Sequence, residues 1–242
     1  MTGFWRRVRI TPASGVAQAE LEDDFHCMSV LVHHDGEIAT QIIPDMRRAP
    51  WSACPGAVSQ LEQTFTGVAL SAFAERGEKK SNCTHLFDLA VLAARHAFAA
   101  EQLIYDVRVS DPVQNERRAE IWRNGTLLLS WKESRFHILE PASAAGLRLD
   151  QLRSWIDALE PDLQEPARLL QWGNMLANGR IIPLELQSDA TRLPPNCFTF
   201  QPERAATARR IGEIRDFSQR AMPPLAEYEP YSQSKQQEFA NK

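Results

Sequence analysis

Three short segments of the 242-residue chain concentrate side chains that could do chemistry: residues 23–27 (Asp-Asp-Phe-His-Cys), 54–57 (Cys-Pro-Gly-Ala) and 83–85 (Cys-Thr-His). Their thiols, imidazoles and carboxylates can bind metal ions or transfer protons. The chain contains neither a Cys-x-x-Cys nor a His-Glu-x-x-His motif, so no single segment forms a compact metal site. A shared site therefore requires a fold that brings these segments together.

Two of the cysteines are predicted at helix N-termini. Pro55 after Cys54 is typical of a first helical turn, and Cys83 precedes a long apolar helical pattern. The amides and the positive end of the helix dipole lower the pKa of a thiol there, which makes a thiolate available as a nucleophile or a ligand. We expect the sulfur atoms of Cys54 and Cys83 to lie within about 4 Å of each other.

A structural interpretation of these residues stays open beside the chemical one. A cysteine in a reducing compartment often serves as a small buried apolar residue, and we expect that role for Cys27 and Cys197. His26 and His85, taken singly, are more often structural than catalytic. The sequence does not decide whether Cys197, Arg47 or Arg48 reaches the site, although two adjacent arginines could receive an anionic substrate.

Three stretches resemble signatures of an uncharacterised bacterial family, domain of unknown function 2889: residues 22–26, 48–57 (Arg-Ala-Pro-Trp-Ser-Ala-Cys-Pro-Gly-Ala) and 83–90 (Cys-Thr-His-Leu-Phe-Asp-Leu-Ala). This resemblance covers most of the chain and implies no named activity. Residues 20–100 also show a remote similarity to NifU/IscU-like iron-sulfur scaffold proteins, in which strands precede two helices that each begin at a cysteine.

The scaffold similarity implies roles for individual residues. Cys54 and Cys83 match two scaffold cysteines, Asp24 stands where the scaffold has a cysteine, and His26 stands where it has an aspartate. Because a carboxylate replaces a thiolate, the set suits one metal ion better than an iron-sulfur cluster. The implied ligands are His26, Cys54, Cys83 and Asp24, around zinc or iron, with Asp24 and His85 as the catalytic residues; His85 could be a ligand or a general base.

The strand and helix patterns around these residues predict an α+β protein, in which helices pack on an antiparallel sheet. The first fifty residues alternate as strands do, and helical spacing follows over 58–68 and 84–96. Asn124-Gly125 marks a hairpin within the strand-like residues 105–140. Further helices are predicted over 148–160, 165–178 and 202–217.

We predict a NifU/IscU-like metal-site core over 1–104, a hairpin-plus-helical extension over 105–226 that covers it, and a polar, mobile tail over 227–242. Residues 192–198 are expected at the mouth of the site.

Composition limits the partners and the location. With 27 Lys and Arg against 31 Asp and Glu, the chain carries a formal charge of −4, and no long basic run suggests a nucleic-acid surface. No apolar stretch approaches the ~18 residues of a membrane span, and no signal-peptide core follows Met1. We expect a cytoplasmic protein.

The resulting hypothesis is a metal-dependent enzyme, a hydrolase or a lyase, that uses zinc or iron on a small organic substrate in a lidded pocket. Two alternatives stay open: a non-catalytic iron-sulfur or metal scaffold or delivery protein, and a structural partner-binding module with buried thiols. The sequence is also compatible with a homo-oligomer.

Overall fold

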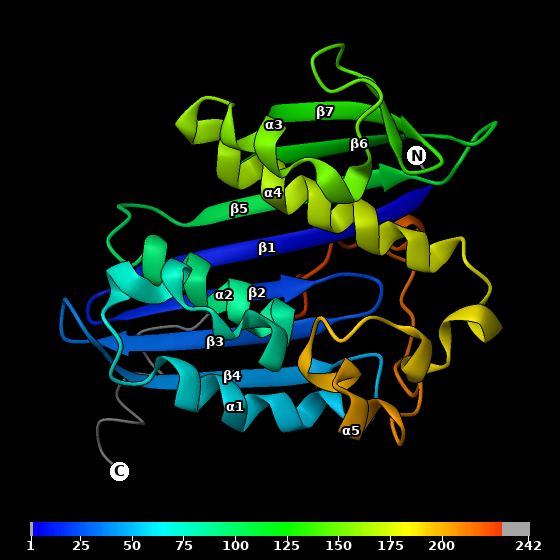
Figure 1. Ribbon diagram of the computed structural model, residues 1–242. Coiled ribbons are helices and arrows are strands. Elements are labelled where there is room, and N and C mark those ends of the chain that lie inside the picture. Colours follow the sequence, from blue (N-terminus) through cyan, green and yellow to red (C-terminus); the bar gives the residue numbers. More distant parts are fainter. Residues whose placement is uncertain (1, 229–242) are drawn as a thin grey trace. The chain divides into compact units, whose positions relative to one another are not determined.

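The computed structural model describes residues 2–228 (Figure 1). Most of the predicted tail, residues 229–242, lies outside the described residues. The strands are β1 (Gly3–Ala13), β2 (Val16–Glu22), β3 (Cys27–His34), β4 (Ala39–Arg48), β5 (Leu103–Ser110), β6 (Glu116–Arg123), β7 (Thr126–Ser134) and β8 (His137–Glu140). The α-helices are α1 (Ala57–Phe65), α2 (Thr84–Arg95), α3 (Arg153–Asp157), α4 (Pro161–Leu176) and α5 (Pro202–Ala205). Among the short 3₁₀ helices are η1 (Cys54–Gly56), η2 (Leu70–Glu75) and η8 (Phe198–Phe200).

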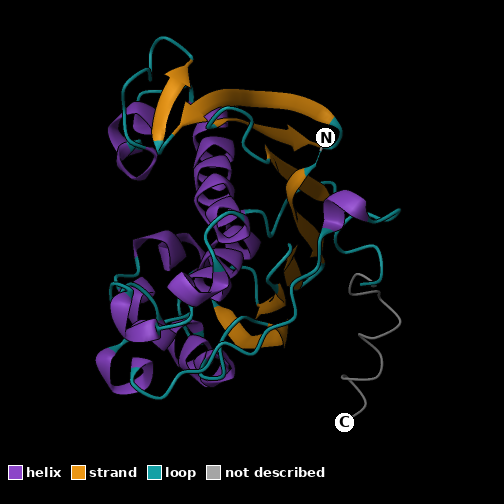
Figure 2. Cartoon of the chain, turned by 90° about the vertical axis from the view of Figure 1, so that its right-hand side faces the viewer, coloured by secondary structure: helices purple, strands orange, loops and turns teal. Residues whose placement is uncertain are grey.

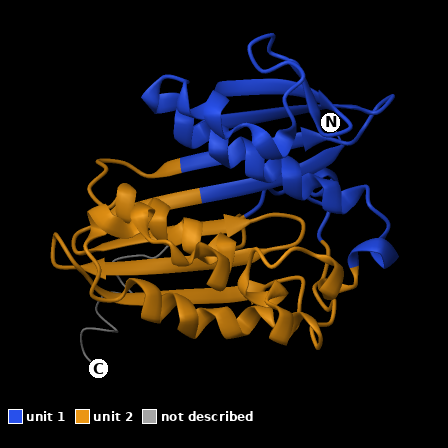
Figure 3. Cartoon of the chain, viewed as in Figure 1, with its two compact units in different colours: residues 1–8, 104–187, 215–224 blue, residues 9–103, 188–214, 225–242 orange. Residues whose placement is uncertain are grey.

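The chain forms two compact units (Figure 3). Unit 1 comprises residues 1–8, 104–187 and 215–224, and unit 2 comprises residues 9–103, 188–214 and 225–242. All the residues that the sequence singled out for chemistry belong to unit 2. Segment 188–214, distant in sequence, belongs to the same unit.

In unit 2 the strand order is β4-β3-β2-β1, with antiparallel pairing of β2 with β3 and of β3 with β4. Helix α1 packs on β4, and α2 packs on β2 and β3 (Figure 1). The apolar spacing predicted over 58–68 and 84–96 explains this packing, because it buries one side of each helix. Phe65 of α1 stacks on Phe73 at 4.3 Å between ring centroids and contacts Phe87 of α2 at 4.9 Å. The predicted meander and both helices are confirmed.

In unit 1 the strand order is β1-β5-β6-β7-β8, and α4 packs on β6 and β7. Asn124 and Gly125 have φ values of 47° and 83°, the left-handed conformation of a two-residue hairpin turn, so the predicted hairpin is confirmed. Figure 2 shows helices gathered on one side of the strands in this unit and in unit 2. The α+β class with an antiparallel, helix-packed sheet is confirmed, whereas the NifU/IscU-like core stays a prediction.

Two predicted helices are wrong in extent. In place of a helix over 148–160, α3 covers only Arg153–Asp157, because Pro161 disfavours helical geometry at the residue before it and begins α4. In place of a helix over 202–217, α5 ends at Ala205. The chain beyond it hydrogen-bonds to another segment: Ser52 N–H donates to the Arg209 carbonyl (2.9 Å) and Ile211 N–H to the Pro50 carbonyl (3.1 Å).

The first residues of the predicted tail are part of the packed structure. Tyr228 is buried, and its hydroxyl lies 2.8 Å from the Ser29 hydroxyl of β3. Within residues 2–228, no helix has the length and apolar character needed to span a bilayer.

Candidate functional site

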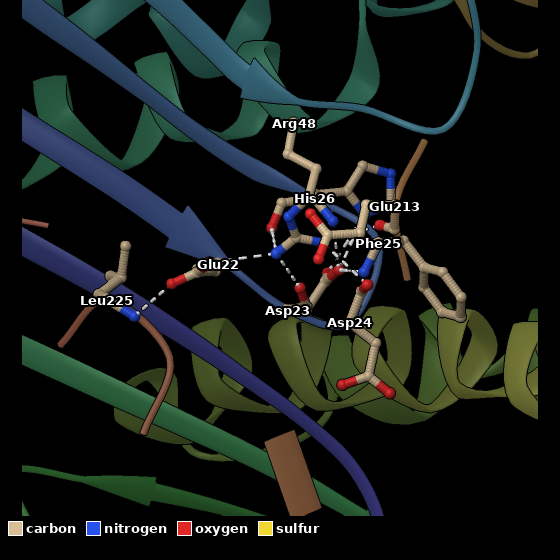
Figure 4. Close-up of polar contacts among 8 residues, drawn as sticks. All are labelled: Glu22, Asp23, Asp24, Phe25, His26, Arg48, Glu213 and Leu225. Atoms are coloured by element: carbon tan, nitrogen blue, oxygen red, sulfur yellow. Dashed lines mark hydrogen bonds and ion pairs between the residues drawn. The ribbon is translucent and has the colours of Figure 1, made fainter. Parts of the chain in front are cut away.

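His26 lies in the short loop that connects β2 to β3 (Figure 4). The Asp23 carboxylate accepts hydrogen bonds from the backbone N–H groups of Phe25 and His26, both at 2.8 Å, and lies 3.0 Å from His26 Nδ1. Asp23 is completely buried, and His26 is almost so. The carboxylate therefore fixes both the turn and the orientation of the imidazole ring.

Arg48, at the end of β4, holds the same loop from the other side (Figure 4). Its guanidinium donates to the carbonyls of Asp23 (2.7 Å), Asp24 (2.8 Å) and His26 (3.1 Å), and to the Glu22 carboxylate (3.1 Å). A buried guanidinium is stable only when its donors are satisfied. The terminal nitrogens of Arg48 are thus paired with acceptors of the protein itself, which gives this residue a structural role.

The neighbouring Arg47 also has partners within the protein. Arg47 pairs with Asp45 at 2.9 Å and lies over the Tyr228 ring at 3.7 Å. The two adjacent arginines therefore have different partners: Arg48 bonds to the loop between β2 and β3, and Arg47 contacts Asp45 and Tyr228.

His85, in the first turn of α2, packs against His26. The ring centroids are 4.0 Å apart, with 30° between the ring planes. His26 is almost completely buried, whereas His85 is half-buried, so His85 is the more accessible of the two stacked imidazoles.

Cys54, Cys83 and Cys197, here called the thiol group, come together from three segments of unit 2. The three thiols are near enough that, beyond the larger effect of burial, charge on Cys54 or Cys197 raises the pKa of Cys83, and charge on Cys54 raises the pKa of Cys197. Cys54 Sγ lies 3.3 Å from the Thr199 hydroxyl. Three of the four cysteines in the chain therefore share one environment.

Backbone contacts hold the Cys197 segment in this place. Phe198 N–H donates to the Asn82 carbonyl at 2.9 Å, directly before Cys83. The Phe198 ring packs so closely on Gly56 that a Cβ atom there would lie 3.1 Å from it. These contacts support the expectation that residues 192–198 approach the site, and they bring the Cys197 segment beside the one that precedes Cys83.

The protonation of the thiol group differs from the prediction. Burial raises the pKa of Cys54 and Cys197, and it raises the pKa of Cys83 to about 12. Backbone N–H groups of His85 and Leu86 act in the opposite direction on Cys83, but their effect is smaller. The prediction of helix-activated thiolates is wrong, because the loss of hydration outweighs the favourable helix N-terminus.

Arg210 places a positive charge near Cys54 of the thiol group. The guanidinium carbon of Arg210 lies over the Trp51 ring at 5.6 Å and over the Phe25 ring at 5.8 Å from the centroids. Its charge lowers the pKa of Cys54, against the larger effect of burial. Arg210 was not predicted, because residue 210 fell in the charged helix expected over 202–217.

The four implied metal ligands are only partly brought together. Figure 4 shows the Asp24 carboxylate directed away from the His26 ring. Among residues 2–228, no group of three or more His, Cys, Asp or Glu side chains is placed to hold a metal ion. The metal centre and the expected 4 Å separation of Cys54 and Cys83 stay predictions. Asp23, next to the predicted Asp24, is the carboxylate that contacts His26.

A scan against models of known protein families finds no match, and a search of curated proteins finds no significant match. The resemblances to the domain of unknown function and to the scaffold proteins stay expectations.

Proposed function

We propose that unit 2 binds one zinc or iron ion through thiols of the thiol group, and that the protein acts on a small organic molecule there. The observation that carries the proposal is the gathering of Cys54, Cys83 and Cys197 from three separate segments. Thiols are soft ligands, typical of zinc and iron sites.

The chemistry of the donors fits such a metal, although their placement is not yet that of a ligand shell. Since the described residues contain no ready group of three ligands, binding would require the thiol side chains to reorient. A bound cation would also displace the protons that burial keeps on these sulfurs. When bound, the metal would polarise a carbonyl or activate water.

The other residues of the site have roles that do not depend on the metal. His85 is the accessible imidazole and is proposed to give or take a proton of the substrate. His26 supports its ring face at 4.0 Å, and Asp23 orients His26. Arg48 keeps the loop rigid, so the imidazole pair is preorganised.

A structural module with buried thiols is the second candidate, because protonated, desolvated thiols also pack well as apolar residues. A metal scaffold or delivery protein is the third. The three candidates predict different metal contents: one zinc or iron ion, no metal, or iron with acid-labile sulfide.

Metal analysis of the untagged full-length protein tests the proposal, with single Cys→Ala variants of Cys54, Cys83 and Cys197. We expect one metal ion in the wild type and an affinity about 10- to 100-fold lower in each variant. The matched control is Cys27→Ala, because Cys27 is buried elsewhere, with Leu225 and Tyr228, and should retain wild-type affinity. Equal affinity in all four variants, or a metal-free wild type after zinc and iron loading, would exclude the metal site.

A further inference from the structure

Arg210 differs from other arginines of unit 2 in the partners of its guanidinium. Its Nε atom is enclosed without a hydrogen-bond partner, as is the Nε atom of Arg48, so the difference lies in the terminal nitrogens. Within residues 2–228, the Arg210 guanidinium forms neither an ion pair nor a hydrogen bond, and its carbon lies over the rings of Phe25 and Trp51. Arg9 and Arg48 of the same unit each pair with a carboxylate, Glu20 and Glu22 respectively.

The backbone holds Arg210 firmly in this place. Residue 210 forms an antiparallel bridge with Trp51, and the Arg209 carbonyl and the Ile211 N–H bond to segment 50–52. Gly212 approaches so closely that a Cβ atom there would lie 2.5 Å from the Ala49 carbonyl oxygen. The unpaired guanidinium is therefore not the consequence of a loose chain.

We infer that Arg210, between Phe25 and Trp51 and beside Cys54, is a binding site for the oxyanion of a small molecule, a carboxylate or a phosphate group. The guanidinium carbon lies 5.8 Å from the Phe25 ring centroid and 5.6 Å from that of Trp51. Aromatic rings offer no acceptor in the guanidinium plane, where carboxylate and phosphate groups bind in a bidentate manner. Because Nε is enclosed, the oxyanion is expected to pair with Nη1 and Nη2.

The surroundings favour an anion over a second cation or an apolar group. Within residues 2–228 the guanidinium has aromatic neighbours and no carboxylate partner. Burial lowers the pKa of Arg210, as expected for a desolvated cation without a counter-ion. An incoming oxyanion would supply that counter-ion.

Titration of the full-length protein with benzoate and, separately, with inorganic phosphate tests the inference. Isothermal calorimetry gives the dissociation constant, and the shift of the Arg210 Nε–H resonance reports the position of binding. We expect at least one probe to bind in the millimolar range, with a dissociation constant about tenfold higher in Arg210→Gln and an intermediate value in Arg210→Lys. Stronger binding of benzoate identifies a carboxylate site, and stronger binding of phosphate a phosphate site.

Arg209→Gln is the matched control, because Arg209 is the adjacent, exposed arginine and its side chain donates to the backbone carbonyls of residues 207 and 208. It should bind the probe as the wild type does. Equal weakening in Arg209→Gln and Arg210→Gln, or no binding of either probe at about 20 mM, would overturn the inference. The oxyanion site does not require a bound metal. Measuring the metal content of the same samples tests the metal proposal separately, so that either proposal can fail without the other.

Discussion

Arg48 and Arg210 lie in the same unit and differ in what surrounds them. Arg48 donates to a carboxylate and to carbonyls of the loop before β3, and every donated bond fixes the protein itself. Arg210 has two aromatic rings as neighbours and no acceptor among the described residues. The terminal nitrogens of Arg48 are thus paired within the protein, whereas those of Arg210 are not.

Whether a buried charge has acceptors within the protein distinguishes charges that stabilise the fold from charges that could bind a ligand. A buried polar group that is fully hydrogen-bonded makes a fold specific, whereas a fixed but unpaired cation is expected where the partner arrives from outside. Asp23, whose carboxylate accepts from two backbone N–H groups and lies 3.0 Å from His26 Nδ1, belongs to the first kind. Arg210 belongs to the second kind, because the aromatic rings beside it do not pair with its charge.

The largest expected effect is the loss of stability when Arg48 is substituted. Arg48→Met should lower the free energy of unfolding by about 3–5 kcal/mol, because it leaves the Glu22 carboxylate buried beside unsatisfied carbonyls. Arg210→Met should change it by no more than about 1 kcal/mol, because only contacts with aromatic rings are lost. Urea denaturation of both variants measures the difference. Similar losses in the two variants would contradict the distinction drawn between these arginines.

An effect of intermediate size is expected at Asp23. Asp23→Ala removes the acceptor of two buried backbone N–H groups and of His26 Nδ1, and should cost about 2 kcal/mol of unfolding free energy.

Asp35 offers a matched control, since it accepts from the backbone N–H groups of Glu37 and Ile38 in the same pattern, at an exposed turn. Asp35→Ala should cost clearly less than Asp23→Ala, because water replaces the lost acceptor. A greater loss for the exposed turn would refute the structural role assigned to Asp23.

The smallest effect concerns the protonated thiols. The pKa of Cys83 is raised by folding from 9.0 to about 12, so its contribution to stability is complete below pH 9 and is lost as the pH rises toward 12. Between pH 7 and pH 10, the wild type should lose about 1 kcal/mol more stability than Cys83→Ala. Urea denaturation at both pH values gives this difference. Identical pH dependence in wild type and variant would mean that Cys83 is not held as a neutral thiol.

Local sequence patterns predicted the structure correctly where interactions between residues close in the chain determine it. Asn124-Gly125 forms its turn because both residues tolerate positive φ, and α2 forms because its apolar residues recur on one side. The pattern failed after Ala205, where helical charge spacing was outweighed by backbone pairing with residues 50–52. The sequence of residues 206–212 alone does not indicate that they pair with residues 50–52, more than 150 positions away.

The sequence by itself determined the α+β class, the first meander and the two helices that begin near Cys54 and Cys83. It could not determine which groups share an environment, because Cys197 and Arg210 reach the site only through the return of residues 188–214 to unit 2. It also misjudged protonation. A helix N-terminus is visible in sequence, but the loss of water around a thiol depends on everything packed over it, and that loss keeps Cys83 neutral.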